Sequence, residues 1–354
     1  WRAKDDAAWQ RRGTQTVQLK GLELEQLKRD RKVVEFERMR ADDFDEGDID
    51  VAVLREFTKS KQYGRDAKPI DVLRDAGALN GKAQHREWTN AGALFFTSNP
   101  RRIFAHAYVR LLRFDCRYED EDERPTPTFE RDFDGPLTKQ VRDLRTFVSD
   151  TGFFKSFEVR AADGGFVSEP EYPFIAIDEA IVNAIAHRDY AIQLPIFCEK
   201  YEDAFVVKSP GKLQQQFETP PEFKLTEVVL ESRLRNPRLM DWLREMKDAK
   251  GAAFVKAIRE GTRRMRDEME QLGLPAPVFI NRPAETILLL RNDIKRRTAK
   301  PTGLAASEDI SSSEFANLYK LNGFDGGGAR PRETENRRLF LTALRDKLEA
   351  TGWV

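Results

Sequence analysis

Cysteine and histidine are scarce in this sequence. Of 354 residues only two are cysteine, Cys116 and Cys198, and only three are histidine. Two cysteines this far apart provide neither a disulfide framework nor a zinc site, and they indicate reduced thiols in a cytoplasmic protein. The histidines, His85, His106 and His187, are scattered, and no serine lies in a Gly-X-Ser-X-Gly elbow. Nothing in the sequence therefore indicates nucleophilic catalysis.

Net charge and long apolar runs are absent as well. The 60 basic and 60 acidic residues cancel, which excludes a chain that binds polyanions through an overall positive charge. No apolar run approaches the roughly 20 residues that a membrane span needs, and no signal segment is present. We therefore expect no membrane partner and a cytoplasmic location. Because the chain starts at Trp1 rather than Met, we expect a further domain upstream.

The apolar pattern along the chain alternates between helix and strand. Residues 135–154 carry apolar side chains at helical spacing, and residues 108–114 alternate as a strand does. Two apolar runs around a Tyr-Glu-Asp turn predict a hairpin over 196–211, and a continuous run predicts a buried strand over 285–291. Further helices are predicted at 71–80, 173–190, 236–246, 261–273 and 333–353. Either Asp48 or Asp50 is expected to cap a helix near the start of the chain.

Two segments are predicted to lack regular structure. Residues 117–133 are charged and contain proline, which favours an exposed loop, and residues 162–173 are interpreted as a turn. The whole pattern predicts an α/β fold in four parts. These are an N-terminal and connecting region (1–165), a two-layer α/β sandwich (166–291), a linker (292–313) and a C-terminal helical segment (314–354).

The stretch "EAIVNAIAHRDY" (179–190) places unusual polar residues on one side of a helix. At 100° per residue, Glu179, Asn183 and His187 share a stripe opposite Ile181 and Ile185. A carboxylate can take a proton from water, and an amide oxygen is a hard ligand suited to Mg²⁺. The stripe therefore predicts a ligand site, and a solvated polar face is the alternative interpretation.

Several short motifs follow one another in a characteristic order. "YPFIAIDEAIVNAIAHRDY" is followed by a hairpin, "SPGKL", "SRLRNPRLMDWL" and "EGTRRMRDEMEQLGLPAPVF", and "LRDAGALN" and "TNAGALFFTSNP" lie upstream. In this order they resemble the RecG-related and Schlafen AlbA-domain proteins that carry a GHKL-like ATP-binding domain. The resemblance implies that the sandwich is of the GHKL (Bergerat) type. It also implies ATP and Mg²⁺ as cofactors, and an AlbA-type DNA-binding domain before Trp1.

The resemblance implies roles for several of these residues. Glu179 corresponds to the glutamate that activates the attacking water, and Asn183 to the asparagine that binds Mg²⁺. His187 and Arg188 match the family's His-Arg-Asp-Tyr motif. For His187 two interpretations stay open, a hydrogen bond to phosphate or to backbone at the helix end.

Two positions depart from the family pattern. Ser209-Pro210-Gly211 stands where GHKL proteins have Asp-X-Gly, and a serine lacks the carboxylate that reads adenine. Gly261 and Thr262 occupy the second glycine motif, whose backbone N–H groups bind phosphate. Arg263 replaces a glycine there, so it either crowds a phosphate or binds it.

Three hypotheses about function remain at this stage. The first is an ATP-binding, ATP-hydrolysing regulatory module that works with a DNA-binding domain, as a transcriptional regulator or defence protein. The second is a degenerate scaffold that binds nucleic acid or protein without chemistry. The third is a subunit of a homodimer or larger assembly, in which the apolar face of the C-terminal helix docks a partner.

Overall fold

The computed structural model describes residues 7–294, apart from 13, 22, 25–26, 29–35, 65, 83–84, 124, 161–164, 216–218, 231–232, 248–252 and 256–260. The chain divides into two units, Trp1–Thr298 and Ala299–Val354. The helix predicted at 333–353, the segment 314–354 and most of the linker at 292–313 lie outside the described residues. Within the described part, the fold is α/β, as the sequence predicts.

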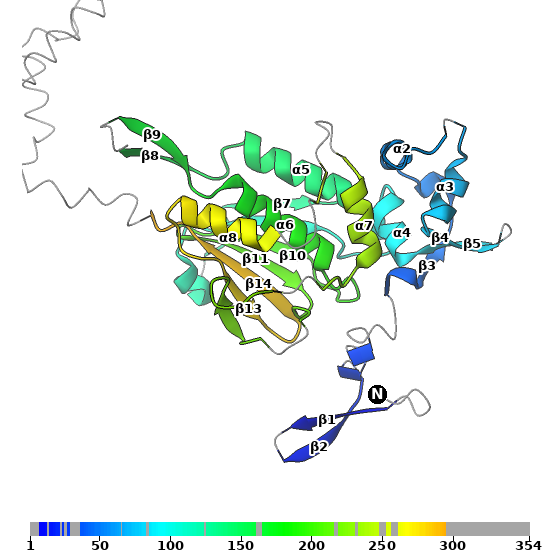
Figure 1. Ribbon diagram of the computed structural model, residues 1–354, viewed down its shortest axis with the longest axis horizontal. Coiled ribbons are helices and arrows are strands. Elements are labelled where there is room, and N and C mark those ends of the chain that lie inside the picture. The colour runs from blue at the N-terminus through cyan, green and yellow to red at the C-terminus, as the bar shows by residue number, and fades with distance from the viewer. Residues whose placement is uncertain are drawn as a thin grey trace, which may run out of the picture. The chain divides into compact units, whose positions relative to one another are not determined.

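The main sheet has seven strands in the order β12-β13-β14-β11-β10-β6-β7 (Figure 1). Across the sheet these are β12 (Glu222–Lys224), β13 (Val278–Asn281), β14 (Glu285–Arg291), β11 (Ala204–Pro210), β10 (Ile196–Lys200), β6 (Val109–Arg113) and β7 (Phe129–Phe133). Strand β10 pairs with β6 in parallel, and the other neighbours pair antiparallel. The expected hairpin at 196–211 and strand at 285–291 are present.

Three helices cover one face of this sheet: α5 (Leu137–Asp150), α6 (Phe174–His187) and α8 (Gly261–Gln271) (Figure 1). Helix α6 lies at the centre of the layer and packs on α5, α8, β10 and β11. Its alanine and isoleucine side chains, among them Ile177, Ile181 and Ile185, are buried against these neighbours. The α/β fold is therefore confirmed, and β6, β7 and α5, which precede residue 166, belong to the same two layers as the later elements.

A smaller sheet, β3-β5-β4, precedes the main one in the chain. Its strands are β3 (Arg40–Asp43), β5 (His85–Thr89) and β4 (Leu79–Lys82), and the helices beside them in sequence are α2 (Val51–Ser60), α3 (Pro69–Asp75) and α4 (Asn90–Phe96). Of the two capping candidates, Asp50 caps α2 by accepting a hydrogen bond from Val53 N at 2.9 Å. The turn after α3 requires Gly77, whose φ is +75°.

Helix α7 (Pro237–Glu245) joins the two regions. Trp242 inserts among Phe57, Phe95 and Phe96, with ring centroids 6.2, 5.2 and 5.0 Å apart. Glu37 accepts hydrogen bonds from two backbone N–H groups in the first turn of α7, at 2.9 and 2.8 Å, and so caps this helix from a distant segment. The hydrophobic core is therefore continuous across residue 165.

Some strands differ from the sequence prediction. Strand β7 occupies the second part of 117–133. Strand β9 (Phe166–Pro170) lies within the region interpreted as a turn, and it pairs with β8 (Ser156–Arg160), which precedes that region. A further hairpin, β1 (Ala8–Arg12) with β2 (Gln15–Leu19), opens the described chain. These strands are mostly exposed, so they lack the one-sided apolar alternation that identifies a strand.

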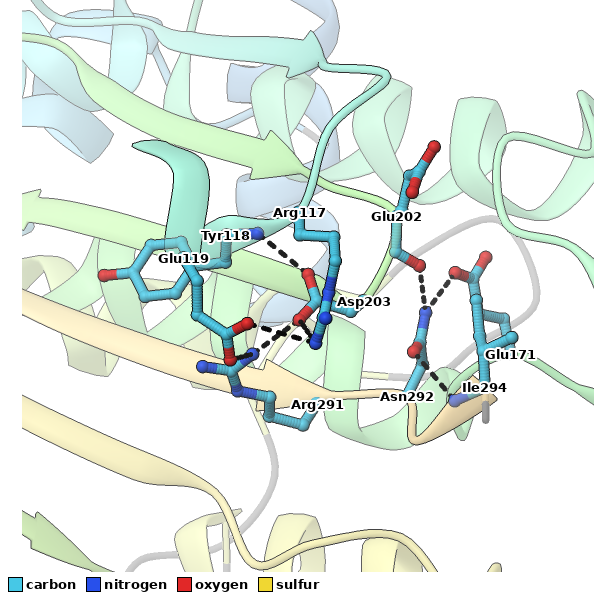
Figure 2. A network of polar contacts seen from close by, with 9 residues as sticks. All are labelled: Arg117, Tyr118, Glu119, Glu171, Glu202, Asp203, Arg291, Asn292 and Ile294. Atoms are coloured by element: carbon cyan, nitrogen blue, oxygen red, sulfur yellow. Dashed lines mark hydrogen bonds and ion pairs between the residues drawn. The ribbon is translucent and has the colours of Figure 1, made fainter. Parts of the chain in front are cut away.

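A polar network fixes the end of β14 to the β10–β11 turn (Figure 2). Asn292 Nδ2 donates to Glu171 Oε1 at 2.7 Å and to the backbone oxygen of Glu202 at 2.8 Å. Beside it, Arg291 NH1 lies 2.6 Å from Asp203 Oδ2. The last described strand of the main sheet is therefore held by residues that come much earlier in the chain.

Candidate functional site

A cavity of about 180 Å³ lies beside helix α6 and strands β11 and β14. Helices α7 and α8, strand β13, residues 211–215 and 233–235, Leu230 and Val255 complete the described lining. Seven of the nine site residues predicted from the sequence line it: Glu179, Asn183, His187, Ser209, Gly211, Gly261 and Thr262. The structure thus brings together three segments that are separated by tens of residues in the sequence.

Glu179 and Asn183 are hydrogen-bonded to each other within the cavity lining. Asn183 Nδ2 donates to Glu179 Oε1 at 3.0 Å, which leaves the amide oxygen Oδ1 for another partner. Burial raises the pKa of Glu179 above its ordinary value of 4.5, and the nearby charge of Asp178 acts in the same direction. The hydrogen bond from Asn183 and the charge of Arg264 oppose this rise in pKa.

The carboxylate of Glu179 rests directly on Gly261, the first residue of α8. A Cβ atom added at Gly261 would lie 1.6 Å from Glu179 Oε1, so no larger residue fits while Glu179 keeps this position. The glycine is therefore needed for close contact between the carboxylate and the start of a helix. Helix N-termini attract negative charge, so this end of α8 favours an anion.

His187 is half-buried one helical turn beyond Asn183. Burial lowers the pKa of His187 to about 4, and the positive charges of Arg235 and Arg244 lower it further. The imidazole is therefore neutral at physiological pH, and a hydrogen bond with the backbone of Arg233 opposes the fall in its pKa. A neutral ring can hydrogen-bond a ligand, but it cannot form an ion pair with phosphate.

Ser209 ties the sheet to the helical layer. Its Oγ donates to the backbone oxygen of Ala184 on α6, at 3.0 Å. Two residues later Gly211 has φ of +105°, and a Cβ atom there would lie 2.7 Å from Asp189 Cβ. The backbone conformation and this close approach both require glycine.

Three of the sequence motifs meet at this point. Asp189 of "HRDY" pairs with Arg235, which lies just before α7, with 3.1 Å between Oδ2 and NH1. Arg235 NH2 also donates to the backbone oxygen of Lys212, at 2.7 Å. Asn236 Nδ2 donates to the backbone oxygens of Ala186 and Arg188, at 3.0 and 2.8 Å, and so closes the end of α6. Asp189, Arg235 and Asn236, for which the sequence alone predicted no role, therefore hold the segments that form the cavity wall.

The remaining two predicted residues do not line the cavity. Arg188 is buried, with NH2 donating to the backbone oxygen of Leu194 at 2.6 Å and its guanidinium 4.8 Å from the ring centre of Tyr190. Burial lowers its pKa. The Arg263 side chain is 74% exposed and lies 3.6 Å from Asp267, so it neither crowds nor lines the cavity.

Part of this site is similar to a known protein family. Residues 194–290 match a family model (HATPase_c_4) described as putative ATP-dependent DNA helicase recG C-terminal. The matched segment is therefore similar to a RecG-related ATPase-like domain. It contains the hairpin β10–β11 and the residues Ser209, Gly211, Gly261 and Thr262, whereas Glu179, Asn183 and His187 precede it.

The fold is shared with a solved structure. It is the crystal structure of the DIP2311 protein from Corynebacterium diphtheriae, with a TM-score of 0.52 and 22% sequence identity. The likeness covers 81% of this chain and 53% of that one, so the chain spans about half the length of that protein. No curated protein matches the chain. Among the helices of the described residues, none is long and apolar enough to cross a membrane.

Most of the positive charge around the cavity was not predicted from the sequence. Five basic residues line the cavity: Lys212, Arg233, Arg235, Arg244 and Arg264. The only acidic residue in the described lining is Glu179. Arg264 lies next to the predicted Arg263, so the sequence indicated a basic residue at the start of α8 but the wrong one of two neighbours. Lys212, Arg233 and Arg235 lie in motifs of which only the order was used, and Arg244 follows one of these motifs directly.

The donor set determines what kind of metal ion would fit. No group of three or more His, Cys, Asp or Glu side chains that could hold a metal occurs in the described part of the chain. Asn183 Oδ1 and the Glu179 carboxylate are isolated hard oxygen donors. Mg²⁺ commonly takes one or two protein oxygens and completes its shell with water and phosphate oxygens. The site therefore suits Mg²⁺ that arrives with a phosphate ligand.

Proposed function

We propose that this chain binds ATP with Mg²⁺ in the cavity beside α6 and hydrolyses it. The observation that carries the proposal is the Glu179–Asn183 pair, which is held against the glycine that begins α8. A base, a hard oxygen ligand and a helix N-terminus lie together in a cavity whose other charged lining residues are basic. The match of residues 194–290 to an ATPase-like family supports the same assignment.

In this proposal Asn183 Oδ1 is the protein ligand of the metal. Mg²⁺, when bound, would neutralise phosphate charge and orient the phosphates. Electrostatics also favour a cation here, because a phosphate at the start of α8 would otherwise meet the Glu179 carboxylate. The hydrogen bond from Asn183 Nδ2 orients both side chains before any ligand arrives.

Glu179 is the proposed general base. Its raised pKa makes it a stronger proton acceptor than an ordinary exposed carboxylate, because burial disfavours the charged form. In the reaction, Glu179 takes a proton from water as the water oxygen forms its bond to the terminal phosphorus. The bond between that phosphorus and the bridging oxygen breaks, and the electron pair remains on ADP.

The basic residues bind the phosphates in this proposal. Arg264 lies on the first turn of α8 and acts on the charge of Glu179, so it would approach the same terminal phosphate. Arg235 and Arg244 come from the other side of the cavity. Planar guanidinium groups match phosphate oxygens with paired hydrogen bonds, which favours phosphate over other anions.

The proposal extends to regulation through α7. This helix contributes Met240 and Arg244 to the cavity, while its N-terminus is capped by Glu37 and its Trp242 packs into the N-terminal core. A ligand that displaces α7 would therefore act on the N-terminal region as well. Action together with a DNA-binding domain, a regulatory role in transcription or defence, and a homodimer remain predictions of the same hypothesis.

The test compares nucleotide binding and turnover in matched variants. We expect the Asn183→Ala chain to bind Mg²⁺-ATP more weakly, and the Glu179→Gln chain to bind it normally while turnover falls about 100-fold or more. Arg264→Ala should weaken binding, whereas its exposed neighbour Arg263→Ala is the control and should behave like wild type. Binding is measured by calorimetry, and turnover by phosphate release.

A scaffold without chemistry is the second candidate. Ser209 favours it, because this hydroxyl stands where GHKL proteins have a carboxylate and is itself bonded to backbone. If the wild-type chain binds no Mg²⁺-ATP at millimolar concentration, the scaffold hypothesis holds and the ATPase proposal is wrong. If binding is normal but Glu179→Gln leaves turnover unchanged, the assignment of the base is wrong.

A further inference from the structure

Arg145, on helix α5, contacts two segments that flank the candidate site. Its Nε and NH2 groups pair with the two carboxylate oxygens of Asp178 on α6, with NH2 lying 2.8 Å from Oδ2. The same NH2 group donates to the backbone oxygen of Phe254, at 2.9 Å. One guanidinium group therefore joins α6 to the segment that lies between α7 and α8.

Each partner of Arg145 is directly followed in the chain by a residue that lines the cavity. Asp178 precedes Glu179, the proposed base, and Phe254 precedes Val255. The side chains of Arg145 and Asp178 are only 19% and 24% exposed. A paired arginine–carboxylate contact that is shielded in this way has a defined geometry, unlike most ion pairs at the surface.

The segment at Phe254 is packed closely against α5. Its ring is buried, and the guanidinium carbons of Arg142 and Arg145 each lie 5.6 Å from the ring centre. Phe254 N donates to the backbone oxygen of Met246 at the end of α7, at 3.3 Å. Arg142 has a different ionic partner, Glu56, at 2.8 Å. The two arginines therefore share the contact with the ring but differ in their polar partners.

We propose that Arg145 is a positioning residue, which fixes the segment at Phe254 against α6 and so sets the place of Glu179 relative to the start of α8. The chain continues from Phe254 to Gly261, on which the Glu179 carboxylate rests. Arg145 also neutralises the carboxylate of Asp178, which would otherwise add a second negative charge beside the base. The inference rests on the proposed function, because it concerns the base of that reaction.

The experiment measures kcat and KM for Mg²⁺-ATP with the full chain. In Arg145→Ala we expect kcat to fall about 10-fold or more, because a small displacement of a reacting group lowers the rate steeply. KM should change by less than about 3-fold, since Asn183 and the basic residues of the cavity are intact. Arg145→Lys keeps the charge without the fork of donors, so its kcat should fall by only about 3-fold.

Arg142→Ala is the matched control. It removes the same kind of side chain from the same ring, one helical turn away, and kcat should stay close to that of the wild-type chain. The double variant Arg145→Ala, Asp178→Ala should lose little more kcat than Arg145→Ala alone, because the two residues share one interaction.

Hydrogen exchange gives a readout that does not depend on turnover. In Arg145→Ala the amide of Phe254 should exchange about 10-fold faster or more, since the carbonyl group of the same residue loses its donor. The amides of β14 should exchange at the wild-type rate, which shows that the variant is folded. In Arg142→Ala both sets of amides should behave as in the wild-type chain.

The outcomes separate this inference from the proposed function. A normal kcat in Arg145→Ala or Arg145→Lys, while the wild-type chain is active, would overturn the inference and leave the ATPase proposal intact. An equal loss of kcat in Arg142→Ala, or a loss confined to KM, would also overturn it, because packing or ligand binding would then explain the effect. Absence of turnover in the wild-type chain would show the proposed function to be wrong, and the inference with it.

Discussion

Asp189 and Arg235 form an ion pair in which both side chains are almost fully buried, at 3% and 8% exposure. The two residues are 46 positions apart in the chain. Arg235 reaches the backbone of Lys212 from the same position, and Asp189 Oδ1 accepts from Ala191 N at 3.0 Å. The pair therefore connects the end of α6, the turn after β11 and the segment before α7, which are three walls of one cavity.

Breaking this pair should destabilise the protein strongly. Asp189→Ala leaves the Arg235 guanidinium buried without its partner carboxylate, and we expect the free energy of unfolding to fall by about 3 kcal/mol. The double variant Asp189→Ala, Arg235→Ala should be destabilised by clearly less than the sum of the two single variants, because the partners share one interaction. Urea unfolding of all four proteins measures this coupling. Additive effects would show that the pair does not act as a unit.

Gly261 should be essential for turnover rather than for folding. In Gly261→Ala the new Cβ atom would overlap Glu179 Oε1, so the carboxylate must move. A displacement of this size at a general base lowers the rate by about 100-fold. Gly64→Ala is the control, since a Cβ atom there meets nothing within 4 Å. Phosphate release measures both variants, and normal turnover by Gly261→Ala would contradict the assignment.

His187 should make the stability of the chain depend on pH. Its pKa in the folded protein is about 4, below its ordinary value of 6.5, so the unfolded chain binds the proton more readily between these values. The stability from His187 is full above pH 6.5 and is lost as the pH falls towards 4. Between pH 8 and pH 5 we expect a loss of about 2 kcal/mol from this group. His187→Gln should show a smaller fall in urea unfolding over the same range, and an identical fall would contradict the prediction.

Glu37 should affect the proposed nucleotide site although it does not line the cavity. Glu37→Ala removes the acceptor of two backbone N–H groups of α7, and we expect a loss of about 2 kcal/mol in unfolding free energy. Because α7 carries Arg244 into the cavity, the affinity for Mg²⁺-ATP should fall as well. Glu46→Ala, an exposed site in the same region, is the control. Reduced stability with unchanged affinity would show that α7 does not couple the two regions.

The sequence predicted the elements whose burial is strong and one-sided. Strand β14 and the hairpin β10–β11 stood out because their side chains are almost all buried, and α5 because its apolar residues recur at helical spacing. Strand β7 was missed because it is an edge strand with exposed charges at Glu130 and Arg131. An exposed strand forms because it pairs with a neighbouring strand, and a single sequence does not show which strand that is.

The same limit applies to the candidate site. Glu179, Asn183 and His187 could be found together because helical spacing alone brings them to one face. The Asp189–Arg235 pair could not be found this way, since it depends on how distant segments pack. Arg263 was chosen where Arg264 lines the cavity, because one position along a helix turns the side chain by 100°.

The hydrogen bonds of Asn292 hold the C-terminal end of the last described strand of the main sheet. They join the end of β14 to Glu171 and to the backbone of Glu202, both of which belong to earlier parts of the chain. The C-terminal end of strand β14, which lies away from Thr286 and the cavity, is thus held by hydrogen bonds to residues that precede the strand in the chain. A truncation after residue 294 would keep these anchors, and it offers a shorter protein for crystallisation with nucleotide.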